Sequence, residues 1–78
     1  MVNLRHALTH ARRGDWEAAH RMVQADDSML GAWFHGILHA QEGDLSNARY
    51  WYERAQRSFA SRGNTDEELE RLESELLD

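Results

Sequence analysis

The stretch Gly31–Gly43, GAWFHGILHAQEG, decides how the rest of the chain must be arranged. Drawn as a helix with about 100° per residue, it gathers its bulky apolar side chains on one side: Trp33, Phe34, Ile37 and Leu38. The opposite side carries small residues and the imidazoles of His35 and His39. Neither side is suited to water, so we expect a central helix that the rest of the chain covers on both sides.

Length and composition indicate a single all-α domain spanning residues 1–78. The chain has no proline, while Ala, Leu, Glu and Arg are plentiful, which is typical of helices. It has no cysteine, which excludes disulfides and thiolate metal sites. No apolar run is long enough to cross a bilayer, and residues 1–8 lack the apolar core of a secretory signal. We therefore predict a cytoplasmic protein with no membrane partner.

The charge pattern argues against a nucleic-acid partner. The net charge is −5, and acidic residues are concentrated in residues 65–78. Arginine supplies all of the basic side chains, but they form no extended basic run. An acidic chain lacks the positive surface that a phosphate backbone needs, so we expect no binding to nucleic acid.

Two helical hairpins are expected, each turned by a glycine followed by an aspartate. The first covers residues 3–25, where Gly14 supplies the left-handed residue that ends a helix and Asp15 caps the next one. The second covers residues 29–61, with the same turn at Gly43-Asp44 and a second helix that fades near residue 61. Each hairpin has apolar residues at the i, i+3, i+4, i+7 spacing of a helix with one buried face.

The two hairpins repeat each other with a period of 29 residues. The shift superposes several pairs: His6 on His35, His10 on His39, Gly14 on Gly43, Asp15 on Asp44 and Ala19 on Ala48. Repeated hairpins bury a shared core by stacking, and a last helix closes the open end. Residues 65–77 suit that role because their apolar residues form one narrow leucine seam. Thr65, with Glu68 three residues later, predicts a capping box at the start of this helix.

The second hairpin resembles a tetratricopeptide repeat. The residues that carry the resemblance are Gly36, the turn Gly43-Asp44, and Ala48, Tyr52 and Ala55. Residues 48–55, ARYWYERA, are also similar to the second helix of a Sel1-type repeat. The resemblance covers about 60 residues, with a period shorter than the family's usual ~34 residues. It implies a TPR-like superhelix, two stacked hairpins with a capping helix, that acts as an interaction scaffold and has no catalytic residues.

Histidines are the most unusual chemical feature of the chain. Four of the five form two i, i+4 pairs, His6 with His10 and His35 with His39, and such a pair can place two imidazoles on one metal ion. His20, on the inner face of the helix before the central one, can meet His35 and His39. One hypothesis is therefore a site for Zn²⁺ or another transition metal at His20, His35 and His39. The other is that these imidazoles are hydrogen-bonded core residues.

A small-ligand site at the same place is a further hypothesis. Gln24 and Asn47 are expected near the three imidazoles, and Tyr50 with Arg54 can line a groove with polar groups. No HExxH motif is present, and no nucleophile is paired with a base, so the sequence indicates no catalytic residue.

Two functions follow from these patterns. The first is a small interaction module without a cofactor, which binds a protein or peptide partner in the groove between the helix at residues 3–13 and the central helix at residues 31–43, or pairs with a second copy. The alternative is a metal- or small-ligand-binding protein that uses His20, His35 and His39.

Overall fold

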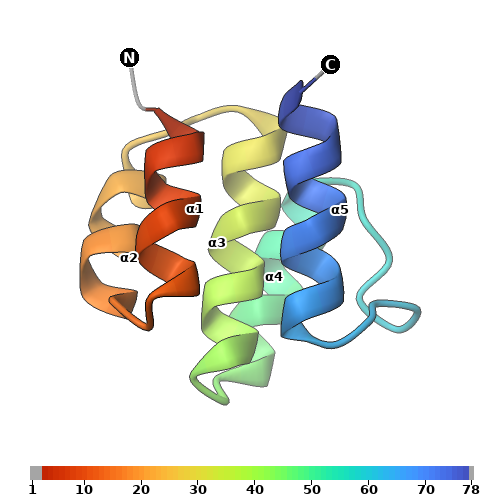
Figure 1. The fold of residues 1–78 in the computed structure, drawn as a ribbon. Coiled ribbons are helices and arrows are strands. Elements are labelled where there is room, and N and C mark those ends of the chain that lie inside the picture. Colours follow the sequence, from red (N-terminus) through yellow and green to blue (C-terminus); the bar gives the residue numbers. More distant parts are fainter. Residues whose placement is uncertain (1–2, 78) are drawn as a thin grey trace.

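The chain is all-α. In a computed structural model, which describes residues 3–77, it forms five helices and, within those residues, no strand (Figure 1). The helices are α1 (Leu4–Arg12), α2 (Trp16–Gln24), α3 (Met29–Gln41), α4 (Leu45–Arg54) and α5 (Thr65–Leu77). None of these helices is both long and apolar enough to cross a membrane.

The third helix lies at the centre of the molecule. α3 packs against α2, α4 and α5, while α1 packs against α2 and α5. Figure 1 shows α3 upright between α1 and α5, with α4 behind it. The large apolar side of α3 is fully covered, and His35 and His39 on its other side are only 6% and 7% exposed. The predicted helix covered on both sides is therefore confirmed.

A glycine in α3 sets how closely α4 approaches. A Cβ atom built on Gly36 would lie 2.6 Å from Cδ1 of Tyr52 and 3.1 Å from the carbonyl oxygen of Ala48. Cβ atoms in proteins essentially never lie this close to another side chain, so only glycine fits here without moving the tyrosine ring. The residue of α4 that precedes Tyr52 is Trp51, and its ring lies against the imidazole of His35.

The turns within both hairpins have the predicted glycine. Gly14 and Gly43 have φ angles of +80° and +90°, a conformation that side chains with a Cβ atom rarely adopt. The carboxylate of Asp44 accepts from the backbone N–H of Asn47 and so caps α4. The same prediction is wrong for Asp15, which makes no side-chain cap bond. Its Oδ2 atom lies 3.2 Å from Nδ1 of His10 instead.

The fourth helix ends earlier than the sequence suggested. We expected it to run to about residue 61, but α4 ends at Arg54 because Gln56 adopts a left-handed conformation with φ +58°. Hydrogen bonds from Gln56 N to Glu53 O and from Arg57 N to Tyr52 O complete a Schellman motif. Residues 55–64 are therefore a connecting segment, and its Phe59 turns back to meet the ring of Tyr52 edge-on.

The cap of the last helix is displaced by one residue from the predicted position. The reciprocal pair is Asn64 and Glu67, and not Thr65 and Glu68. Asn64 Oδ1 accepts from Glu67 N, and Glu67 Oε1 accepts from Asn64 N, both at 2.9 Å. The carboxylate of Glu68 is thereby free to turn into the core.

The last helix packs against two other helices, α1 and α3. α5 buries Leu69 and Leu72 and lies against both α1 and α3. Its C-terminal end is bound to α1, since Arg5 Nη2 donates to the carbonyl oxygen of Leu76 at 3.0 Å and Arg12 pairs with Glu73 at 3.2 Å. The α1–α3 groove that we expected to receive a partner is therefore in contact with the chain's own α5.

Candidate metal centre

Three imidazoles meet between the two hairpins. The Nε2 atoms of His20, on α2, and His35, on α3, are 3.0 Å apart and share a hydrogen bond. The ring of His39, one turn further along α3, has its centroid 5.1 Å from that of His20 and 4.9 Å from that of His35. One ring nitrogen of each histidine lies within 4.8 Å of the others. The predicted meeting of these three side chains is confirmed.

Two tryptophans fix the planes of two of these rings. Trp16 stacks on His20 with a centroid separation of 4.7 Å and an interplanar angle of 9°, and Trp51 stacks on His35 at 4.0 Å and 13°. Trp16 is itself held because its Nε1–H donates to the carbonyl oxygen of Leu38 at 2.7 Å. Rings packed in this way have little freedom to turn, so the imidazoles are positioned before anything binds.

Burial favours the uncharged form of two of these imidazoles, His35 and His20. Burial, and then the neighbouring His39 and His20, lowers the pKa of His35 from 6.5 to about 4. Burial and His39 also lower the pKa of His20, and the nearby carboxylate of Glu42 partly opposes this shift. A neutral imidazole has a free nitrogen lone pair, which is the form that a metal ion needs.

The distances suit a transition-metal ion. Two imidazole nitrogens bound to tetrahedral Zn²⁺ at about 2.0–2.1 Å stand about 3.3 Å apart. The separation of 3.0 Å between His20 and His35 differs from this by only a few tenths of an ångström. His39, with a ring nitrogen within 4.8 Å of one on each of the other two rings, would be the third donor, and a fourth position would be left for water or a small ligand.

A carboxylate lies beside the third imidazole. Glu42 Oε2 is 2.7 Å from Nδ1 of His39. Asp44 lies close to both, but its two carboxylate oxygens already accept from the backbone and side-chain nitrogens of Asn47. Glu42 is the residue that ends α3, so its side chain reaches back by one turn to His39.

The structure does not join the other predicted site residues to this cluster. Gln24 is exposed, Asn47 donates to Asp44 at 3.4 Å, and Tyr50 is 51% exposed with its hydroxyl accepting from Arg54. None of the three makes a hydrogen bond to the imidazoles anywhere in residues 3–77. The candidate site therefore consists of the histidines, the two tryptophans and Glu42.

The first histidine pair stands apart. The rings of His6 and His10 are 4.9 Å apart on the outer side of α1, where His6 is exposed. Across the described part of the chain, no third metal-ligating group joins them. They are therefore an internal comparison for the pair on α3, which has the same spacing and a third imidazole.

Sequence reasoning missed a second polar cluster, centred on Glu68. This carboxylate is only 4% exposed. Four groups donate to it: Tyr52 Oη at 2.6 Å, Arg71 Nη1 at 2.7 Å, Gly63 N at 3.3 Å and Trp33 Nε1 at 3.4 Å. Burial opposes ionisation, but these bonds outweigh it and hold the pKa of Glu68 below its usual range. The signal was available, because a buried tyrosine or tryptophan needs a partner for its polar atom.

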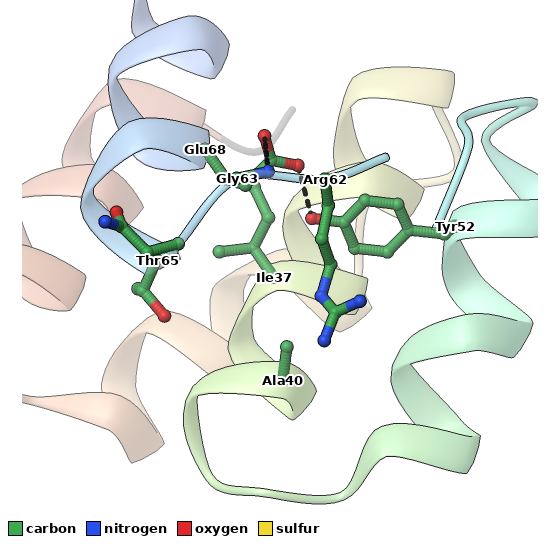
Figure 2. A pocket seen from close by; sticks show the side chains of 8 residues that line it. Ile37, Ala40, Tyr52, Arg62, Gly63, Thr65 and Glu68 are labelled. Carbon is green, nitrogen blue, oxygen red and sulfur yellow. Dashed lines mark hydrogen bonds between the residues drawn. The ribbon is translucent and has the colours of Figure 1, made fainter. Parts of the chain in front are cut away.

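A cavity of about 200 Å³ lies beside Glu68 (Figure 2). Its lining comes from α3, from Tyr52 on α4, and from the turn before α5 together with the first turn of that helix. Both charged groups in it are already engaged: Glu68 holds its four donors, while Arg62 bonds to the carbonyl oxygen of Phe59 at 3.0 Å and lies over its ring. The cavity therefore offers a ligand less free polar bonding than the histidine cluster.

No protein-family model, curated protein or solved structure matches this chain.

Proposed function

We propose that this protein binds one transition-metal ion, with Zn²⁺ as the first candidate, through His20, His35 and His39. The observation that carries the proposal is the convergence of three imidazoles from two helices, with one nitrogen of each within 4.8 Å of the others. Three imidazole nitrogen donors favour Zn²⁺, Ni²⁺, Co²⁺ or Cu²⁺ over Mg²⁺ and Ca²⁺, which prefer oxygen. A bound ion links α2 to α3 and so ties the first hairpin to the second.

The first test uses the metal-free protein and Zn²⁺ alone. Anything that binds only the folded state raises the melting temperature. A Zn²⁺ concentration of 100 times Kd adds about 2.7 kcal/mol, which corresponds to roughly 10–20 °C for a domain of this size. Calorimetric titration is expected to give one ion per chain. Binding below about a tenth of an equivalent, with no rise in melting temperature, would leave the imidazoles as a packed, hydrogen-bonded core.

A pair of variants assigns the site. His20 is the least buried of the three, so His20→Gln is expected to keep the fold and to weaken Zn²⁺ binding by about 100-fold or more, since loss of an outer partner alone costs about 10–100-fold. His6→Gln is the matched control, because His6 belongs to the exposed pair with the same spacing. The Zn²⁺ affinity of this variant should equal that of the parent. Equal losses in both variants would contradict the assignment.

An interaction module remains the second candidate function, and we place its binding surface on α4. α5 lies against both α1 and α3, so both helices that would line the expected groove also contact α5. The observation that favours this candidate is Tyr50 on α4, half-exposed and bonded to Arg54 at 3.1 Å beside the ring of Trp51. A peptide or a second copy would then bind on the α4 side. If the mass of the protein in solution stays that of a monomer over a wide range of concentrations, binding of a second copy is excluded.

A further inference from the structure

The contact between His39 and Glu42 bears on how the third imidazole is presented. A neutral imidazole has one N–H and one lone pair, and which nitrogen holds the proton is set by the bond that the other nitrogen makes. Glu42 Oε2 lies 2.7 Å from Nδ1 of His39, at the length of a charge-assisted hydrogen bond. A carboxylate only accepts, so Nδ1 carries a proton, and Nε2 is the nitrogen that can offer a lone pair.

We propose that Glu42 is a positioning residue of the metal site, which holds the ring of His39 so that Nε2 is the atom that binds the ion. This inference rests on the proposed metal binding. The three ligands are then alike, since the Nε2 atoms of His20 and His35 already face each other at 3.0 Å. Glu42 does for His39 what the stacked tryptophans do for the other two rings.

The first hairpin shows that the fold alone does not require this contact. The shift of 29 residues superposes His10 on His39 and Arg13 on Glu42. His10 has no glutamate at that place, and its Nδ1 atom lies 3.2 Å from Asp15 of the turn. In the second hairpin, the equivalent Asp44 caps α4 instead. A carboxylate at this place in the repeat therefore occurs in the hairpin that has the clustered imidazoles.

The contact with Glu42 should strengthen metal binding because it limits the orientations and tautomers of the His39 ring. Without Glu42, the His39 ring can turn over or exchange its proton between the two nitrogens, and a metal ion must select one of these forms. Outer partners that fix a ligating histidine are worth about 10–100-fold in metal affinity. The side chain of Glu42 is 38% exposed, so its contribution to the fold itself should be small.

The test compares Glu42→Gln with Asp44→Asn, using Zn²⁺ alone in competition with a chromophoric chelator. Glu42→Gln keeps the size of the side chain but replaces the carboxylate, and it should bind Zn²⁺ about 10–100-fold more weakly than the parent. Asp44→Asn removes the same charge close to the same imidazole without touching its hydrogen bond, and its affinity should stay within about threefold. Both variants should melt, metal-free, close to the parent.

Co²⁺ absorption supplies a readout that a merely structural role would not change. If Glu42 positions His39, the parent and Glu42→Gln form the same complex, so the bands keep their wavelengths while saturation needs more Co²⁺. A shift of the bands in Glu42→Gln would make Glu42 a ligand and overturn the proposal.

The remaining outcomes separate the two proposals. A parent that binds Zn²⁺ with a Glu42→Gln variant of equal affinity overturns the role of Glu42 and leaves the metal site standing. An equal loss in Asp44→Asn assigns the effect to negative charge and also overturns it. A parent that binds neither Zn²⁺ nor Co²⁺ overturns the metal site itself, and the role of Glu42 with it.

Discussion

The protonation of His35 is coupled to folding. In the unfolded chain it takes up a proton near pH 6.5, but in the folded protein burial and two neighbouring histidines delay this until about pH 4. The unfolded state therefore binds more protons between these values. The stabilisation is complete above pH 6.5 and is lost as the pH falls toward 4.

Urea unfolding of the metal-free protein should record this loss. Between pH 7.5 and 4.5 the free energy of unfolding is expected to fall by up to about 3 kcal/mol, since one pKa unit is worth about 1.4 kcal/mol. His35→Gln removes the titrating group, so most of the fall should disappear in that variant. A parent with equal stability at both pH values would show that the imidazole is readily protonated in the folded state.

The identities of the clustered histidines were predictable, but their surroundings were not. The i, i+4 spacing and the repeat placed His35 and His39 on the side of α3 that faces α2, where His20 meets them. The stacking of Trp16 and Trp51 depends on how closely the helices approach. The contact of Gly36 with Tyr52 sets that distance between α3 and α4, and sequence spacing does not reveal it.

Among the elements, the end of α4 carries a conformational cost that can be removed. Gln56 holds φ +58° at a position where glycine is the usual residue, as Gly14 and Gly43 show in the other two turns. The left-handed conformation costs about 1–2 kcal/mol for a residue with a Cβ atom, and the extra freedom of an unfolded glycine returns about 0.4–1 kcal/mol of that.

Gln56→Gly is therefore expected to raise the free energy of unfolding by about 0.5–1 kcal/mol and the melting temperature by a few degrees. Thermal unfolding measures the change. Gln41→Gly, at the last residue of α3, is the contrasting substitution and should lower stability, because glycine within a helix is unfavourable. A destabilised Gln56→Gly variant would contradict the account of this turn.

Helix boundaries at a glycine turn were predicted closely, whereas the end of α4 and the start of α5 were not. The apolar spacing and the Gly-Asp turns predicted α1, α2 and α3 to within a residue or two. α4 continued in the prediction because Phe59 keeps the helical spacing, while the turn depends on a glutamine that carries no local signal. The capping pair of α5 lies one residue before the predicted one because Asn64 and Thr65 are both suitable N-cap residues. The side chain of Glu68 is bonded to Tyr52 and Arg71 and does not cap the helix.

At the scale of the molecule, Glu68 joins four parts of the chain. Its carboxylate binds Trp33 of α3, Tyr52 of α4, the turn at Gly63 and Arg71 of its own helix. The free energy of unfolding of a domain of 78 residues is roughly 4–12 kcal/mol. The hydrogen bonds to one shared buried acceptor can therefore supply a large fraction of it.

Glu68→Gln retains the shape but turns two N–H groups toward donors, and it should lower the free energy of unfolding by about 1–3 kcal/mol. Glu70→Gln, at an exposed position of the same helix, should change it by less than about 0.5 kcal/mol. Chemical denaturation of both proteins makes the comparison. Equal stabilities would mean that the buried bonds to Glu68 contribute nothing net.

The stacking of helices around α3 was predictable because both of its sides avoid water. The position of α5 across α1 was not, since it depends on single contacts such as Arg5 with the carbonyl oxygen of Leu76. Arg57, one of the arginines that could be expected to meet the acidic helix, does pair with Glu75. Nothing in the sequence indicated that Arg5 and Arg12 of α1 would meet this helix as well.

The three indoles lie in two different environments. Trp16 and Trp51 are each stacked on an imidazole, whereas Trp33 is buried beside Glu68 and under the guanidinium of Arg57. A change at the imidazoles therefore alters the light emitted by two of them, and a change in the packing of α5 alters the third. The protein carries its own optical probes, one set for the histidines and one for the interior, without any added dye.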